Sequence, residues 1–155
     1  MSPPASRAGN WRIGAEGLGG EGGTTGRFMA ELRQRVFGMR GVTLTGRGGV
    51  ATADPLPQSA FRLGGLKTVR GFDYGTSQGQ AFWSVQGDWT PLKGKVRPVL
   101  FVDVGQAGTV GGVFEQQPLV GAGAGVSFFN GIVRFDLSVP LAGPAQGLRF
   151  DIQFG

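Results

Sequence analysis

The chain alternates apolar and polar residues over eight segments, which is the pattern of β-strands that have two different faces. The clearest segment sets Val133, Phe135 and Leu137 against Arg134 and Asp136. We expect strands at residues 11–18, 27–37, 42–51, 80–91, 95–105, 119–129, 132–141 and 148–154. A period of two over so many short segments predicts an all-β, antiparallel fold.

One connection is far longer than a hairpin turn and covers residues 52–79. Loops of this length without structure of their own are usually functional or disordered. This loop carries apolar residues such as Phe61 and Leu63, so we expect it to be packed rather than solvated. The expected organisation is a disordered stretch at residues 1–9, followed by one β-barrel domain at residues 10–155 that carries this loop.

Composition favours a sheet in a membrane over a sheet in water. Only 16% of the residues are charged, against an average of about 25%. The expected strands also approach the ~9–11 residues that cross a tilted bilayer. Aromatic residues gather near strand ends, as in the interfacial girdles of outer-membrane barrels: Trp11, Trp83, Trp89, Phe128, Phe129 and Phe154. We therefore predict an antiparallel transmembrane β-barrel. A soluble β-sandwich binding module is an alternative, because alternation also occurs in soluble sheets.

Charge and residue types narrow the possible chemistry. The net charge is +5, but the basic residues form no run, so we expect no nucleic-acid partner. The chain has no Cys and no His, which removes disulfides, thiol chemistry, Cys/His metal sites and His-based triads. We expect no enzyme activity, no catalytic residue, no metal and no cofactor. Arg134 and Arg149 stand beside Asp136 and Asp151 and predict ion pairs rather than an acid/base pair of carboxylates.

Two short motifs bracket the strand that follows the long loop. Val69-Arg70-Gly71-Phe72 lies in the loop, and Phe101-Val102-Asp103-Val104-Gly105 lies on the strand at residues 95–105. A buried arginine keeps its proton and needs an anionic partner. Asp103 is on the polar face of its strand and can accept a bidentate, directional bond from Arg70.

These motifs and the closing strands resemble the C-terminal barrel region of the bacterial surface-antigen superfamily, over Trp11 to Phe154. Its members include BamA and TamA, which insert outer-membrane proteins, and FhaC-type two-partner secretion pores. The resemblance implies that Arg70 anchors a loop returning into the barrel and that Asp103 receives it. The family often has an inward acidic residue on the strand after the loop. The nearest match is Gln86, with Asp88 on the same face, and the sequence leaves open which of them contacts Arg70.

The last strand resembles the C-terminal sorting signal of outer-membrane barrels, a glycine followed by alternating apolar residues: Gly147, Phe150, Ile152 and Phe154. The resemblance implies a place in the bacterial outer membrane and a role in protein insertion, assembly or translocation. The implied partners are outer-membrane lipid and client outer-membrane or secreted proteins. A small structural or passive-pore barrel is the alternative, and it would not need the pairing of Arg70 with Asp103.

The number of strands leaves three arrangements open. The family barrel has sixteen strands and eight are expected here, and an open sheet in lipid would leave two unpaired edges, which is not tolerated. The chain is therefore half of a larger barrel, or closes a barrel by self-association of two copies, or forms a small eight-stranded barrel with its loop largely outside. Residues 1–10 lack the apolar stretch of a secretory signal, which favours the first arrangement.

Overall fold

The computed structural model describes residues 10–20, 23–36, 39–51, 60–144 and 146–154. The predicted disordered stretch at residues 1–9 and part of the predicted loop, residues 52–59, lie outside the described residues. The prediction of an all-β, antiparallel fold is confirmed. The long strands are β1 (Asn10–Gly20), β2 (Gly23–Arg35), β3 (Val42–Ala51), β6 (Ala81–Trp89), β7 (Val96–Gly108), β8 (Leu119–Phe128), β9 (Val133–Ala142) and β10 (Arg149–Phe154).

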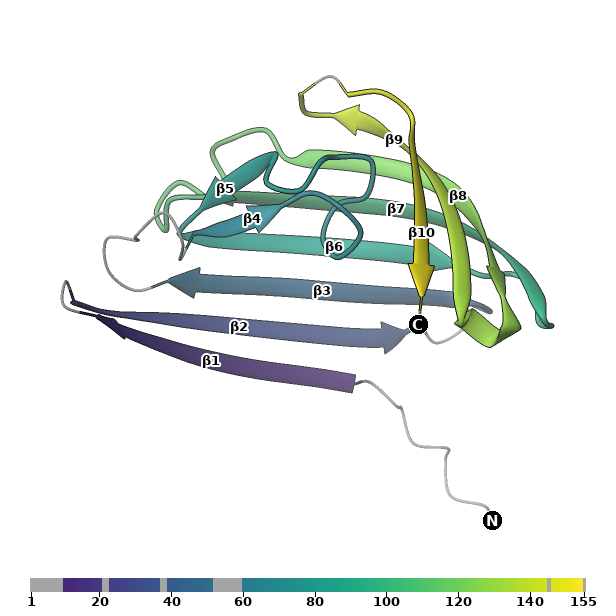
Figure 1. Ribbon diagram of the computed structural model, residues 1–155, viewed down its shortest axis with the longest axis horizontal. Coiled ribbons are helices and arrows are strands. Elements are labelled where there is room, and N and C mark those ends of the chain that lie inside the picture. The colour runs from purple at the N-terminus through teal and green to yellow at the C-terminus, as the bar shows by residue number, and fades with distance from the viewer. Residues whose placement is uncertain (1–9, 21–22, 37–38, 52–59, 145, 155) are drawn as a thin grey trace, which may run out of the picture.

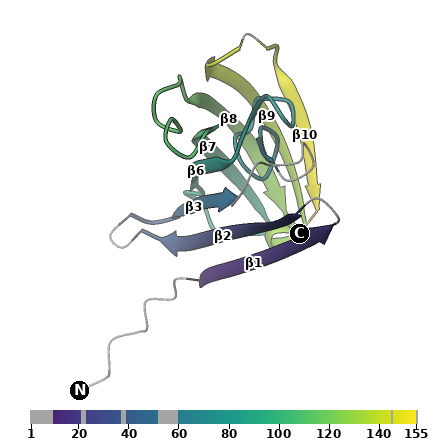
Figure 2. The same ribbon diagram turned by 90° about the vertical axis from the view of Figure 1, so that its left-hand side faces the viewer.

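These strands form a single sheet in the order β1-β2-β3-β6-β7-β8-β9-β10 (Figure 1). Each neighbouring pair is antiparallel. Within the described ranges, β1 pairs with β2 and β10 pairs with β9, so the sheet stays open at both edges. The predicted small eight-stranded barrel is therefore not formed by these strands. An eight-stranded barrel has room inside for its own side chains alone, whereas this sheet curls around a loop (Figure 2).

Most strand boundaries fall within two or three residues of those expected. The largest difference is at the start of β2, which begins at Gly23 rather than at residue 27. β7 continues to Gly108 because Ala81 of β6 pairs with it there. The predicted turn between β8 and β9 is a short 3-10 turn, Phe129–Gly131. No helix among the described residues is long and apolar enough to cross a membrane.

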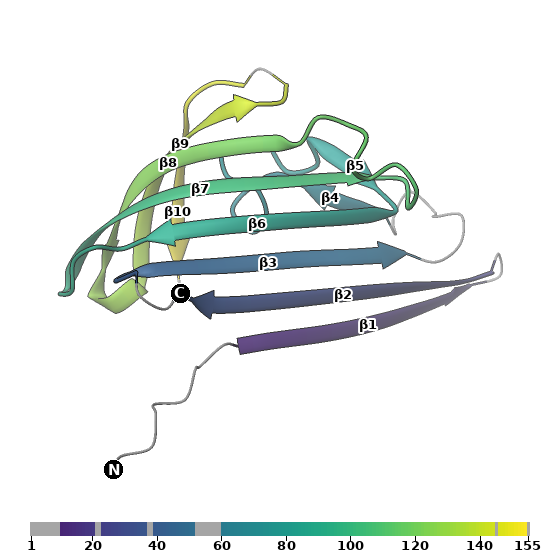
Figure 3. The ribbon, with the colours of Figure 1, turned by 180° about the vertical axis from the view of Figure 1, so that it is seen from behind.

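The two faces of the sheet reverse the usual pattern of a soluble protein. On the convex face apolar side chains are exposed, for example Val102 at 51% and Phe150 at 58%. Figure 3 shows this face of the sheet over β3, β6 and β7. On the concave face, polar side chains are buried, with Asp103 at 0% and Asp136 at 1% exposed. From β3 to β10 the predicted division into an apolar and a polar face is confirmed, and the polar face is the inner one.

A second, two-stranded sheet lies on the concave face and consists of β4 (Phe61–Leu63) and β5 (Ser77–Gly79). Both strands belong to the described part of the predicted loop, residues 60–79, which we call the motif loop. Figures 1 and 2 show the motif loop inside the curve of the sheet, against β6 and β7. The hydrophobic core lies between the motif loop and the main sheet: Ala51, Phe61, Leu63, Val69, Phe72, Phe82, Ala107 and Leu119. The loop is thus a packed layer, as its apolar residues predicted.

Candidate functional site

The backbone of the motif loop folds back on itself and presents one arginine to the sheet. β4 and β5 pair through Phe61 with Gly79 and Leu63 with Ser77, and the turn between them is tightened by a hydrogen bond from Gly65 N to Phe72 O of 2.8 Å. The side chains on either side of the motif arginine, Val69 and Phe72, are fully buried. These apolar contacts fix the position from which the arginine reaches the sheet.

Arg70 makes four hydrogen bonds to two carboxylates, and we call this group the buried anchor. Its Nε and Nη2 donate to Asp103 Oδ2 and Oδ1, each at 2.6 Å, and its backbone N donates to Asp103 Oδ2 at 2.9 Å. Its Nη1 donates to Asp88 Oδ1 at 2.9 Å. Arg70 is 3% exposed and Asp103 is 0% exposed. Bidentate, charge-assisted bonds of this kind fix both the distance and the orientation of the arginine.

Phe101, the first residue of the second motif, forms a platform for this arginine. The guanidinium carbon of Arg70 lies 3.8 Å from the centre of the Phe101 ring, and that of Arg134 lies 5.4 Å from it. Cations above aromatic faces are attracted by the ring quadrupole, more strongly where water is excluded. Phe101 therefore contacts the flat face of the Arg70 guanidinium, and Asp103 accepts hydrogen bonds from its edge.

A second arginine extends the network across the sheet. Arg134 of β9 donates to Asp88 Oδ1 at 2.9 Å and to Asp136 Oδ1 at 2.7 Å. Gln153 of β10 donates to Asp136 Oδ2 at 2.6 Å. The predicted ion pair of Arg134 with Asp136 is confirmed. The network joins the motif loop to β6, β7, β9 and β10.

The charge of Arg70 is stabilised by these partners. Burial by itself lowers the pKa of the Arg70 guanidinium. The hydrogen bonds and the negative charge of Asp103, with a smaller contribution from Asp88, outweigh burial and raise that pKa above its ordinary value. The guanidinium therefore stays charged across the physiological pH range.

The structure distinguishes the two candidate partners on β6. Asp88 supplies the second carboxylate to Arg70, whereas Gln86 Nε2 donates to Leu66 O at 3.1 Å and Gln86 Oε1 accepts from Arg47. Both residues are on the inner face, and Gln86 holds a different point of the motif loop. The sequence placed both on this face but left open which of them contacts Arg70.

Glycines in both motifs make room for the close approach of loop and sheet. Gly71 has a φ of 94°, and a Cβ there would be 3.0 Å from Val139 O. A Cβ on Gly105 would be 2.9 Å from Trp83 O and 3.0 Å from Val69 Cγ2. On β8, a Cβ on Gly121 would collide with Arg70 O. The absence of a side chain at Gly121 therefore leaves room for the backbone of the motif loop on the inner face.

Sequence reasoning missed a second set of contacts, which we call the hairpin contact. Asp73 and Thr76, just after the motif, bind the connection between β9 and β10. Gln146 Oε1 accepts from Asp73 N at 2.9 Å, and Gln146 Nε2 donates to Thr76 Oγ1 at 3.2 Å. Arg149 forms an ion pair with Asp73 and a longer one with Asp151 at 3.2 Å. The pair of Arg149 with Asp151 was expected. The pairing with Asp73 spans 76 positions, and no local pattern signals it.

The residues of the predicted sorting signal lie apart from this network. Phe150, Ile152 and Phe154 point outward from β10, and all three are exposed. Gly147 lies in the connection before β10, where a Cβ would meet no atom within 4 Å. The structure therefore places these residues on the apolar outer face and on an unpaired edge of the sheet.

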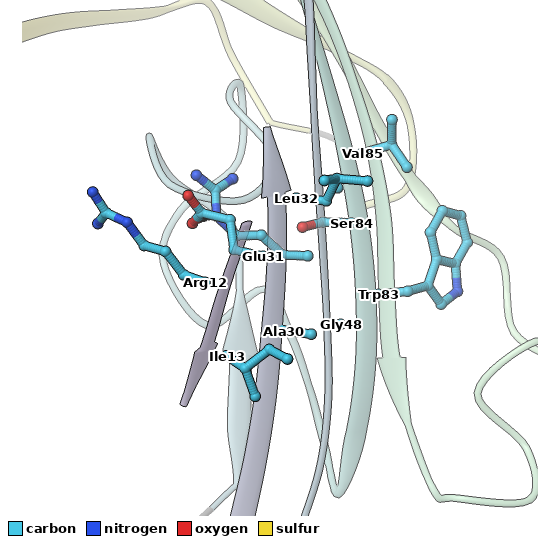
Figure 4. A pocket seen from close by; sticks show the side chains of 11 residues that line it. Arg12, Ile13, Ala30, Glu31, Leu32, Gly48, Trp83, Ser84 and Val85 are labelled. Carbon is cyan, nitrogen blue, oxygen red and sulfur yellow. Dashed lines mark hydrogen bonds and ion pairs between the residues drawn. The ribbon is translucent and has the colours of Figure 1, made fainter. Parts of the chain in front are cut away.

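A shallow depression of about 500 Å³ lies over β1, β2, β3 and β6. Figure 4 shows its lining residues on both sides of the strands: Arg12 and Glu31 project to one side, and Leu32, Val85 and Trp83 to the other. The accessible surface of the depression is almost entirely apolar. It has no convergent set of polar groups of the kind that orients a ligand. The buried anchor is thus the candidate functional site.

The anchor can hold a loop but offers little for acid–base or nucleophilic chemistry. Its carboxylates are all engaged by guanidinium groups, and the chain has no His or Cys. What the geometry supplies is a fixed position for the motif loop over the polar face of the sheet.

Comparison with known protein families assigns the chain to a family of secretion proteins. A family model described as "Haemolysin secretion/activation protein ShlB/FhaC/HecB" matches residues 45–128, which is more than half of the 155 residues. The matched range runs from β3 through the motif loop to the end of β8. No curated protein matches the chain.

Proposed function

The chain belongs to the haemolysin secretion/activation protein family ShlB/FhaC/HecB, and on this premise we propose that it forms part of an outer-membrane pore that secretes a protein. Membership of this family implies a function in protein secretion at the outer membrane. Within that function we propose translocation of a polypeptide, not insertion of outer-membrane proteins, because the matched family is described by secretion.

The observation that carries the proposal is the fastening of the motif loop to a polar concave face. Arg70 holds the loop through two carboxylates on neighbouring strands, Asp103 on β7 and Asp88 on β6. A loop held over a polar surface controls access along that surface. We propose that the buried anchor sets the position of the loop in the pore and that polypeptide passes over the same polar face.

The reversed faces of the sheet support a position in the membrane. The convex face exposes apolar side chains that water would disfavour and hydrocarbon would accept. In hydrocarbon the free edges of β1 and β10 must also be paired, because each unpaired backbone group costs several kcal/mol there. We propose that further strands, of the same polypeptide or of a second copy of this chain, complete the barrel.

Conductance of the reconstituted protein tests the role of the loop. In planar bilayers with potassium chloride on both sides, we expect Arg70→Lys to open more often than the unchanged chain. Lysine keeps the charge but cannot form the bidentate fork. Arg62→Lys is the matched control, since Arg62 is an exposed arginine of β4 in the same loop.

Equal conductance of the chain and its Arg70→Lys variant would contradict the proposal and favour a passive or structural barrel. Folding in buffer without detergent, with no insertion into bilayers, would favour a soluble binding module. Native mass spectrometry of the chain folded in detergent then shows how the barrel closes. A dimer would mean closure by two copies, and a species that folds only when further strands are supplied would mean closure by those strands.

A further inference from the structure

The positive charge of the chain is concentrated at one end of the sheet. The chain has fifteen Lys and Arg and ten Asp and Glu. Six of the basic residues lie at the end of the sheet where β2 leads to β3, β6 to β7 and β8 to β9, and we call them the basic rim: Arg33, Arg35, Arg40, Lys93, Lys95 and Arg97. The other nine basic residues and the ten acidic residues together carry a charge of −1. The six rim residues therefore account for the net charge of +5.

Strand pairing brings the rim residues together. The turn before β3 meets the turn after β6, because Thr90 N donates to Gly41 O at 2.8 Å. The start of β7 meets the 3-10 turn after β8, because Phe129 N donates to Lys95 O at 2.8 Å. These turns therefore share one end of the sheet, on the right in Figure 1.

The rim side chains are free to bind a partner. Arg97 is half-buried and the other five are exposed. The ion pairs found among the described residues use Arg47, Arg70, Arg134 and Arg149 and include no rim residue. Asp88, near the end of β6, is already bound by Arg70 and Arg134. Asp136, toward the same end of β9, is bound by Arg134. Among the described residues, therefore, no ion pair neutralises the rim.

Exposed apolar side chains alternate with the rim residues. Met39 precedes Arg40 and is 62% exposed, and Leu92 precedes Lys93 and is 59% exposed. Val96 follows Lys95 and is 55% exposed. In the same turn region Phe129 and Ile132 are 62% and 59% exposed. A row of basic and apolar side chains at the edge of an apolar surface is typical of the boundary between hydrocarbon and lipid headgroups.

We propose that Arg40, Lys93 and Lys95, the basic-rim residues that lie in the turns, bind the headgroups of anionic phospholipid, with phosphatidylglycerol as its representative. Arg33, Arg35 and Arg97 share the concave inner face with Gln86, Asp88 and Ser127. This inference rests on the proposed function, because it requires the apolar face to lie in a membrane. Short turns of outer-membrane barrels face the periplasm, and that leaflet consists of phospholipid. An acidic polypeptide is a poorer fit, since a solvated chain would leave Met39, Leu92 and Val96 exposed to water.

Native mass spectrometry of the full chain folded in detergent tests the rim, with phosphatidylglycerol or phosphatidylcholine added to the micelles. We expect the unchanged chain to retain phosphatidylglycerol preferentially. Arg40→Gln with Lys93→Gln should weaken that retention by about 30-fold, at about fivefold per basic residue. Arg62→Gln with Lys67→Gln removes the same residue types from the motif loop and should leave retention unchanged. The preference should also weaken as salt is raised.

Three results would overturn the inference. One is equal retention of the two lipids, and another is an equal effect of the two double variants. The third is binding of polyglutamate at the rim without preference for phosphatidylglycerol, which would assign the rim to an acidic polypeptide. Insertion into phosphatidylcholine vesicles, followed by the heat-shifted gel mobility of folded barrels, separates these failures from failure of the proposed function. A chain that inserts without lipid preference refutes the rim alone, whereas a chain that inserts into no vesicle, even when the strands that complete the barrel are supplied, refutes the membrane role.

Discussion

The motif loop is fastened to the sheet at two places that use the same pair of residue types in opposite surroundings. At the buried anchor, Arg70 and Asp103 are 3% and 0% exposed. At the hairpin contact, Arg149 and Asp73 are 33% and 76% exposed. Breaking a buried pair leaves a charge without water or partner, whereas an exposed pair returns to water at little cost. The comparison shows that burial, more than the presence of an ion pair, decides which contact holds the loop.

The largest effect is expected from Asp103→Asn. It leaves the buried guanidinium of Arg70 without its main counter-charge, and loss of one partner of a buried pair costs about 3–5 kcal/mol. Trypsin cleavage at Lys67, followed over time on the chain folded in detergent, measures opening of the motif loop. Cleavage as slow as in the unchanged chain would mean that the apolar contacts of the loop hold it without the anchor.

Gly121→Ala tests the packing of the buried anchor instead of its charge. The new Cβ would collide with Arg70 O, and overpacking of this kind costs about 1–3 kcal/mol. We expect faster cleavage of the loop with no change of charge. Gly46→Ala is the control, because Gly46 also lies within a strand but a Cβ there meets no atom within 4 Å. If the motif loop is cleaved at the same rate in both variants, the close approach of β8 does not restrict the packing of the loop.

Asp88→Asn is expected to be intermediate. Asp88 binds both Arg70 and Arg134 but is 22% exposed, so water replaces part of what is lost. A hydrogen bond to a charged group contributes about 1.5–3 kcal/mol. Cleavage of the loop should lie between that of Asp103→Asn and that of the unchanged chain. Gln86→Asn, a neighbouring position on the same face, tests whether the effect belongs to the contact with Arg70.

Asp73→Asn should have the smallest effect. An exposed ion pair contributes about 0.2–1 kcal/mol and weakens with salt. We expect slightly faster hydrogen exchange in β10 and in the motif loop at low salt, and no difference at high salt. An increase in opening of the motif loop as large as that caused by Asp103→Asn would remove the distinction between the two contacts.

The strands and their faces were predictable because alternation is a local property. The eight segments and the place of Asp103 on the polar face follow from a period of two alone, whereas its inner position followed from the expectation of a barrel in a membrane. The pairing of Arg70 with Asp103 came from the motifs and their resemblance to a family. The choice of Asp88 over Gln86 was not predictable, because it depends on the register that sets Gln86 opposite Asp103 and Asp88 opposite Phe101.

Other features could not be predicted from the sequence, for similar physical reasons. β4 and β5 have three residues each, too few to show a period. The hairpin contact joins Asp73 to Gln146 and Arg149 across more than seventy positions, and neither end has a distinctive pattern. The open edges of β1 and β10 are a property of the whole sheet and not of any segment.

The hydrophobic core carries a consequence for the order in which the molecule folds. Its members all fall between Ala51 and Leu119, and three of its largest buried side chains, Leu63, Val69 and Phe72, come from the motif loop. This central segment can thus exclude water before the strands on either side are in place. We therefore expect it to form the folding nucleus, with the loop already seated when β1, β2, β9 and β10 are added. The residues matched by the secretion family, 45–128, cover nearly the same segment.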